Sequence, residues 1–270
     1  MRAPRQNTES GADGAPPAPE AVGLGSAIRA CVFDLDGVLT RTSTLHAEAW
    51  KTIFDAFLHA FDARTGRLNP PFDQVKDYES YLDGKTRDDG VRSFLASRDI
   101  KLPEGVPDFA HGTETVQGIG AAKQTAFLSL LEVHGPHVHD GSVRFVRAAR
   151  SAGLACAVVT SSANCASVLR AAGIAQLFAA TVDGDDVANR GLIGRPAPDC
   201  YLAAAEALDV APAQAAVFEG TLAGVEAGRA GGFGLVVGID RAGEGQGVRL
   251  LEHGADVVVG DLGELLPTRQ

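Results

Sequence analysis

The sequence predicts an α/β protein with a parallel β-sheet as its core and a helical insertion near the start of the sheet. Two observations carry this prediction. From residue 30 onward, short apolar runs occur between helix-like segments, and near-continuous apolar strands between helices are typical of parallel sheets covered on both faces. Between residues 44 and 132 no strand-like run occurs, and apolar residues recur there with helical spacing.

Six apolar runs are expected to form the strands, because each is short and rich in Val, Ala or Leu. In chain order they are residues 30–33, 154–160, 178–182, 215–218, 234–239 and 256–259. Helices are expected between them, at residues 142–152, 164–172, 198–208 and 222–230. Gly153 and Gly173 directly follow two of these helices, as glycines at helix C-termini commonly do.

The chain divides into a tail, a core domain and a cap domain. Residues 1–26 are rich in Pro, Gly and Ala without periodicity, so a disordered tail is expected there. Residues 27–43 and 133–270 are assigned to the α/β core domain, and residues 44–132 to a helical cap domain. An insertion after the first strand stands above the strand ends, where it can close as a lid.

The composition disfavours several classes of function. The net charge is −10 and there is no run of Lys or Arg, so no nucleic-acid or membrane partner is expected. No apolar stretch approaches the roughly 18–20 residues of a transmembrane helix, and residues 1–20 lack the apolar region of a secretory signal. The cysteines are scattered, which favours a reduced, cytoplasmic protein. The sequence specifies no oligomeric state, and a monomer is compatible with it.

The strongest functional signal is Asp34-Leu35-Asp36-Gly37, at the end of the first expected strand. In extended backbone, side chains i and i+2 lie on one face, so both carboxylates can face one reacting group. Such a pair suits an enzyme in which one Asp attacks phosphate, the other acts as acid and base, and Mg²⁺ neutralises charge. The alternative is a solvated acidic turn. An EF-hand is disfavoured by the early glycine and the missing Glu.

Three later loops supply partners for this pair, each after an expected strand. Thr160, Ser161 and Ser162 end an expected strand at the start of a helix, where hydroxyls and free N–H groups favour phosphate oxygens, although helix N-capping is the alternative for them. Arg195 lies in a Gly-Arg-Pro-Ala-Pro segment ahead of a helix, which suits a cation beside the nucleophile. Glu219 ends the fourth strand, where a metal-binding carboxylate is needed.

Four such loops in this order resemble the haloacid dehalogenase (HAD) superfamily, and within it the beta-phosphoglucomutase-like group. The resemblance covers nearly all of the chain beyond the tail and implies a Rossmann-like parallel sheet core with an inserted helical cap. It implies Asp34 as the nucleophile and Asp36 as general acid and base, with Thr160 and Arg195 as the other catalytic residues. Arg195 takes the place of the usual lysine. The implied cofactor is Mg²⁺, held by Asp34, Asp36 and Glu219.

The same resemblance implies a set of substrate-binding residues, most of them in the cap. They are His46, Trp50, Lys51, Gly84, Arg87, Lys123, Ser162 and Asn164. The first three match a His-x-x-x-Trp-Lys pattern, and Gly84 and Arg87 belong to a substrate-recognition loop. Among them, His46, Arg87 and Lys123 provide cations for a second phosphate of the substrate.

One position departs from the family pattern in a way that matters for the metal. Gly220 stands where the family has an aspartate that binds Mg²⁺ directly. Its absence removes one negative charge and one oxygen from the site. Loss of even an outer partner costs metal sites roughly 10–100-fold in affinity, so we expect a weakened Mg²⁺ site.

The sequence therefore predicts Mg²⁺-dependent phosphoryl transfer on a small-molecule sugar phosphate through an aspartyl-phosphate. The first expectation is a beta-phosphoglucomutase, which converts beta-glucose 1-phosphate into glucose 6-phosphate, because the cap supplies cations for a second phosphate. A sugar-phosphate phosphatase is the alternative with water as acceptor. The alternative of another class is a sugar-phosphate-binding protein with weakened catalysis, because of Gly220.

Overall fold

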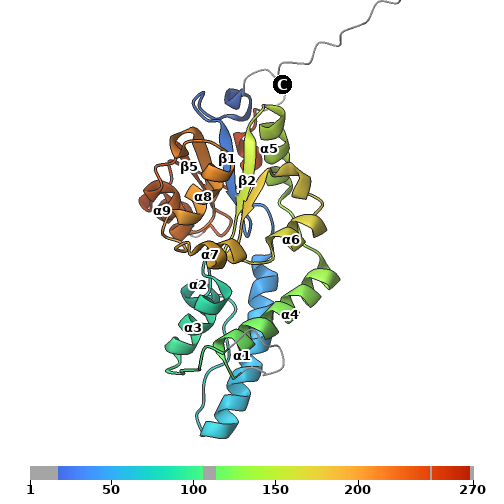
Figure 1. Cartoon of the computed structure of the whole chain (residues 1–270), viewed down its shortest axis with the longest axis vertical. Helices are drawn as coiled ribbons and strands as arrows, with labels where there is room; N and C mark the ends of the chain where they lie inside the picture. The colour runs from blue at the N-terminus through green and yellow to red at the C-terminus, as the bar shows by residue number, and fades with distance from the viewer. Residues whose placement is uncertain (1–17, 106–113, 244, 268–270) are drawn as a thin grey trace, which may run out of the picture.

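The protein contains a six-stranded parallel β-sheet with helices on both faces and four further helices beyond one end of it (Figure 1). This computed structural model describes residues 18–105, 114–243 and 245–267. The strand order is β3-β2-β1-β4-β5-β6. The strands are β1 (Ala30–Asp34), β2 (Ala155–Val159), β3 (Ala180–Val182), β4 (Ala215–Glu219), β5 (Leu235–Ile239) and β6 (Val257–Val259). The predicted α/β class and all six predicted strands are confirmed.

The four helices predicted around the sheet are also confirmed, with ends within two residues of the prediction. They are α5 (Asp140–Ser151), α6 (Cys165–Ala171), α8 (Asp199–Ala207) and α9 (Leu222–Ala230). Two short helices were not predicted, α7 (Gly184–Arg190) and α10 (Gln246–Glu252). Each buries a single side chain, Val187 or Leu250, so neither carries an apolar stripe that sequence periodicity can detect.

Side chains of the central strand β1 alternate between two apolar layers. Cys31 and Phe33 face the layer that contains α5 and α6, whereas Ala30 and Val32 face the layer that contains α8, α9 and α10. All of these β1 side chains are fully buried. In the first layer Phe33 stacks on Phe218 of β4, with ring centroids 4.6 Å apart. Both faces of the sheet are thus covered, as the near-continuous apolar strands predict.

The described residues between β1 and α5 form helices and no strand, as predicted. It contains α1 (Ser43–Thr65), α2 (Lys76–Tyr81), α3 (Arg87–Ser97) and α4 (Val116–His134), which lie below the sheet in Figure 1. These helices enclose an apolar cluster of their own, in which the Phe54 ring contacts those of Trp50, Phe72 and Phe94. A separate apolar core supports our proposal that residues 44–132 form a cap domain on the core formed by residues 27–43 and 133–270.

The prediction of a disordered tail at residues 1–26 is wrong for residues 18–26. A short 3₁₀ helix, η1 (Pro19–Val22), lies against the core, and the Ala18 N–H donates to the carbonyl of Ala152 at 2.8 Å. Val22 and Leu24 are buried in the apolar layer of α5. Removing these two apolar side chains from water favours this packing over a solvated tail. Residues 1–17 of the predicted tail lie outside the described residues. Over the described part of the chain, no helix has the length and apolarity needed to cross a membrane.

Candidate active site

The carboxyl ends of β1, β2 and β4 meet at one edge of the sheet, the edge that faces the cap. β1 lies between β2 and β4, and the chain adds strands first on one side of it and then on the other. Asp34 is the last residue of β1, Glu219 is the last residue of β4, and Thr160 directly follows β2. In open parallel sheets, ligands bind at such a reversal of strand order.

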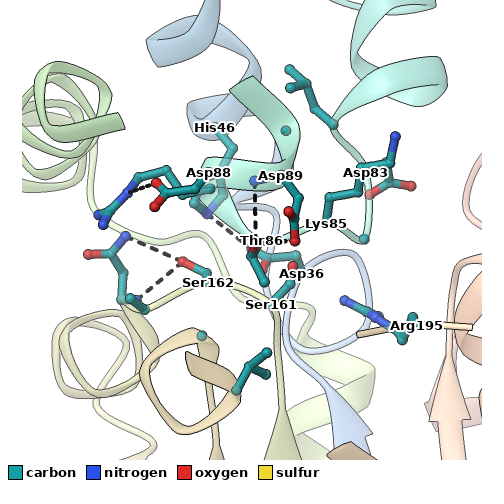
Figure 2. Close-up of a pocket in the computed structure, with 18 of the residues that line it drawn as sticks. Asp36, His46, Asp83, Lys85, Thr86, Asp88, Asp89, Ser161, Ser162 and Arg195 are labelled. Atoms are coloured by element: carbon teal, nitrogen blue, oxygen red, sulfur yellow. Dashed lines mark hydrogen bonds and ion pairs between the residues drawn. The ribbon is translucent and has the colours of Figure 1, made fainter. Parts of the chain in front are cut away.

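A cavity of about 370 Å³ lies between this edge and the cap. Figure 2 shows side chains converging on it from both sides, with His46 and Asp88 from the cap and Asp36, Ser162 and Arg195 from the core. Asp34 also lines it. The structure therefore brings the two predicted aspartates to one cavity, as their spacing predicts. The turn that follows them requires φ = 84° at Gly37, a left-handed conformation that favours glycine.

Hydroxyl groups hold the Asp36 carboxylate in place. Its Oδ2 accepts a hydrogen bond from Thr160 Oγ1 at 3.2 Å, and its Oδ1 accepts one from the Thr42 hydroxyl. Burial raises the pKa of Asp36, and these two hydrogen bonds counteract the rise. A carboxyl group with a raised pKa is suited to act as a general acid.

Arg195 is the cation beside Asp34. Its Nη1 lies 3.2 Å from Asp34 Oδ1 and also contacts Glu219 Oε1. All three side chains are at least nine-tenths buried. Burial raises the pKa of Asp34 well above its usual value, and the charge of Glu219 raises it further, whereas Arg195 opposes the rise. Arg195 therefore favours the ionised, nucleophilic form of Asp34.

Glu219 is surrounded by donors from the protein itself. Besides Arg195, it accepts hydrogen bonds from Tyr201 Oη at 2.6 Å, the Thr221 N–H at 2.7 Å and Thr221 Oγ1 at 3.0 Å. It is fully buried and does not line the cavity. Its oxygens are therefore engaged elsewhere, and the geometry does not favour the predicted role of Glu219 as a metal ligand.

Of the three predicted Mg²⁺ ligands, Asp34 and Asp36 remain. Both line the cavity, and each retains lone pairs beyond its hydrogen bonds. Within the described ranges, no group of three or more His, Cys, Asp or Glu side chains is placed to hold a metal ion. A Cβ atom added at Gly220 would have Ile239 O as its nearest neighbour, at 3.6 Å, so the backbone has room for the missing side chain.

On the cap side, Lys123 and His46 form a buried pair. Lys123 Nζ lies 2.6 Å from His46 Nδ1, and His46 Nε2 lies 3.8 Å from Asp36 Oδ1. Lys123 Nζ also lies 5.2 Å from the ring centroid of Trp50. Burial lowers the pKa of Lys123 to about 7 and lowers the pKa of His46 well below its usual value. Lys123 can therefore change its charge near neutral pH.

The other predicted substrate residues, with one exception, also line the cavity. Gly84 comes from the loop before α3, and Arg87 is the first residue of that helix. Arg87 Nε is buried without a hydrogen-bond partner among the described residues. Ser162 and Asn164 come from the loop after β2, and Asn164 exchanges side-chain hydrogen bonds with Gln124 of α4. This amide pair joins the cap to the core.

Lys51 is the exception. Its Nζ donates to Asp55 Oδ2 at 2.7 Å and to the Phe72 carbonyl at 3.0 Å, and the residue does not line the cavity. In a helix, adjacent residues point in different directions. Trp50 faces the cavity, and Lys51 instead fastens α1 to the loop before α2.

Sequence reasoning missed two side chains that hold the site together, Thr42 and Tyr201. Thr42 binds Asp36, and Tyr201 binds Glu219. A hydroxyl six residues after Asp36 was a usable signal, because the intervening turn is short. Tyr201 gave no signal, since a tyrosine inside an apolar helix is ordinarily a packing residue.

Comparisons with known proteins show what the chain is similar to. The family model of haloacid dehalogenase-like hydrolases matches residues 28–232. A beta-phosphoglucomutase of Mycobacterium tuberculosis is 52% identical over 246 residues, covering 91% of this chain and 94% of the relative. A phosphorylated carbohydrates phosphatase of Thermotoga maritima is 28% identical, covering 86% and 94%. The fold is similar to that of a beta-phosphoglucomutase structure from Clostridium difficile, with a TM-score of 0.70 at 23% identity over 88% of this chain and 93% of that one.

Proposed function

The chain belongs to the HAD superfamily as an enzyme of phosphoryl transfer, and on this premise we propose that it is a beta-phosphoglucomutase. The proposed reaction converts beta-glucose 1-phosphate into glucose 6-phosphate through a bisphosphate. Its main support is the identity with a relative of that name and the cations on two sides of one cavity. Arg195 lies on the core side, and Arg87 and Lys123 lie on the cap side.

In the first step, a carboxylate oxygen of Asp34 attacks phosphorus and the bond to the leaving oxygen breaks. An aspartyl-phosphate forms. Asp36, whose pKa is raised by burial, gives its proton to the leaving oxygen. In the second step Asp36 removes a proton from the accepting hydroxyl, which then attacks the aspartyl-phosphate and frees Asp34. When a sugar hydroxyl accepts the group the enzyme is a mutase, and when water accepts it the enzyme is a phosphatase.

Core residues are proposed to stabilise the charge on the transferred group. The guanidinium of Arg195 is fixed beside Asp34, and Thr160 orients Asp36. Preorganised donors of this kind act most strongly in a buried site, because no reorientation is needed during the reaction. Ser162 and Asn164 contribute polar contacts at the cavity wall.

Cap residues are proposed to hold the second phosphate, which favours the mutase over the phosphatase. Lys123 and Arg87 line the same cavity as Asp34, and His46 links Lys123 to the vicinity of Asp36. Trp50 and Gly84 would contact the sugar. A phosphatase releases its product after one transfer and does not need a second phosphate site.

Phosphotransferases of this family generally depend on Mg²⁺. Here Asp34 and Asp36 would hold the ion, which supplies positive charge next to the transferred phosphate when it is bound. We do not include Glu219, because its oxygens are engaged by Tyr201, Thr221 and Arg195. We propose a small-molecule sugar phosphate as the partner and the cytoplasm as the location, in keeping with four buried cysteines that form no disulfide.

The test is a turnover assay on beta-glucose 1-phosphate with Mg²⁺ and a trace of bisphosphate primer, with Asp34→Asn as the blank. Glucose 6-phosphate and free phosphate are measured side by side. Asp34-dependent glucose 6-phosphate in excess over free phosphate is expected. Free phosphate alone would make the protein a phosphatase. Neither product at high Mg²⁺, together with sugar-phosphate binding by calorimetry, would identify a binding protein with weakened catalysis.

A further inference from the structure

Tyr201 carries a polar group into the interior behind the candidate active site. It is the third residue of α8, is fully buried and does not line the cavity. Its ring packs against Phe233 at 6.2 Å, and its hydroxyl donates to Glu219 Oε1 at 2.6 Å. Any backbone carbonyl could satisfy a buried hydroxyl. The Tyr201 hydroxyl instead binds a carboxylate that also contacts Arg195, the proposed catalytic cation.

The contact continues from Tyr201 to the nucleophile. The same Oε1 of Glu219 accepts a hydrogen bond from Arg195, and Arg195 Nη1 also donates to Asp34 Oδ1. Tyr201, Glu219, Arg195 and Asp34 therefore form one buried row of hydrogen bonds. The other oxygen of Glu219 is held by the backbone and hydroxyl of Thr221.

We propose that Tyr201 is a positioning residue which, through Glu219, holds Arg195 against the nucleophile Asp34. This inference rests on the proposed phosphoryl transfer for its kinetic consequence, although not for its structural one. A long arginine side chain loses considerable conformational freedom when it is fixed. Charge-assisted hydrogen bonds to a fixed carboxylate oppose that loss, and they are strong and directional. The Tyr201 hydroxyl fixes the carboxylate.

Removal of the Tyr201 hydroxyl is expected to change the position of Arg195. One guanidinium nitrogen is shared between two carboxylates, Asp34 and Glu219. Without Tyr201, Glu219 Oε1 keeps Arg195 as its remaining donor among the described residues, so Arg195 shifts toward Glu219 and away from Asp34. The positive charge beside the transferred phosphate then falls. Among the described residues, no hydrogen bond joins Tyr201 to the cap residues that would bind the second phosphate, so we expect the loss in kcat rather than in KM.

The test uses Tyr201→Phe, which keeps the ring and its packing. We expect kcat to fall about tenfold, the effect of losing one hydrogen bond to a charged group, with KM unchanged within twofold. The matched control is Tyr81→Phe in α2. The Tyr81 ring packs on Phe94, and its hydroxyl makes no hydrogen bond with any described residue. The control should keep both constants within twofold.

Two further measurements separate positioning from packing. In a Glu219→Gln background, Tyr201→Phe should change kcat by less than twofold, because residues that act through one another are not additive. In a crystal structure of Tyr201→Phe, Arg195 Nη1 should lie beyond hydrogen-bond distance of Asp34 Oδ1, compared with 3.2 Å in the wild type. An unmoved Arg195, unchanged kcat, or equal changes in kcat and KM would overturn the inference. If the wild type has no sugar-phosphate activity, the proposed function fails, and the crystal structure still decides the role of Tyr201.

Discussion

Lys123 of the cap lies 2.6 Å from the Nδ1 atom of His46, and both side chains are buried. A lysine ammonium group has donors only, so Nδ1 of His46 accepts and its proton resides on Nε2. Nε2 lies 3.8 Å from Asp36 Oδ1 and has no hydrogen-bond partner among the described residues. The pair thus connects a cation of the cap to the proposed acid and base of the core.

The first prediction concerns pH. Burial lowers the pKa of Lys123 to about 7. Among the nearby charges, Asp36 raises this pKa and Arg87 lowers it. The group is charged below that pH and becomes neutral as the pH rises through it. We expect KM to rise above pH 7, by up to about tenfold per pH unit if only the ammonium form binds phosphate.

A KM profile from pH 6 to 9 measures this effect. Lys123→Arg is the control, since a guanidinium stays charged throughout this range. The variant should show a flat profile above pH 7 with the same substrate. A flat profile in the wild type would show that the charge of Lys123 is not needed for binding.

The second prediction concerns Gly220. The position has room for a side chain, because apart from the adjacent residues the nearest atom to the added Cβ is Ile239 O, at 3.6 Å. Gly220→Asp should therefore fold, restore the carboxylate that the family has at this position and tighten Mg²⁺ binding by at least about tenfold. Isothermal titration calorimetry measures the Kd directly. Gly220→Asn has the same size without the charge, and an equal gain in both variants would contradict a role for the missing carboxylate.

The third prediction concerns the amide pair between cap and core. Gln124 and Asn164, which both line the cavity, exchange two side-chain hydrogen bonds. Gln124→Ala removes both, and we expect a looser cap that admits water. The ratio of free phosphate to glucose 6-phosphate should rise about fivefold, corresponding to about 1 kcal/mol. Thr125→Ala, on the exposed side of the same helix, should leave the ratio unchanged.

The fourth prediction tests the proposed cap domain. Phe54 is fully buried among Trp50, Phe72 and Phe94. Phe54→Ala should lower the unfolding free energy of the cap by about 3–5 kcal/mol. Hydrogen exchange should accelerate in α1 to α4 while the amides of β1 stay protected. Phe61→Ala on the half-buried side of α1 should have a smaller effect. Equal acceleration in β1 would mean that cap and core unfold as one unit.

Much of the fold was predictable, because the strands are short apolar runs whose residue spacing is easily distinguished from that of a helix. The predicted strand at residues 215–218 is the observed β4 less its last residue, and the helix predicted at 222–230 is observed unchanged. α7 escaped prediction because its stability comes from the capping box of Asp183 and Asp186 rather than from an apolar stripe. The packing of Val22 depends on a tertiary surface that local sequence does not encode.

Site residues that lie at the ends of strands were predictable from sequence motifs. Residues on helices were less predictable, because the direction of each side chain decides whether it reaches the cavity. Asp34, Asp36 and Arg195 meet at one cavity because the loop after β1 and the loop before α8 lie at one edge of the sheet. The His-x-x-x-Trp-Lys pattern of the cap also contains Lys51, but the position of Lys51 in α1 directs its side chain toward Asp55. The involvement of Tyr201 depends on how α8 packs behind β4, which no local pattern in the sequence reveals.

The position of β1 in the sheet also bears on how the protein forms. β1 ends at Asp34, and its partners β2 and β4 begin only at Ala155 and Ala215. During synthesis the nucleophile strand therefore leaves the ribosome long before either neighbour exists, and its apolar side chains have no sheet to join. Contacts so distant in sequence slow folding and expose strand edges. Nascent chains that stop before β4 should depend most on chaperones.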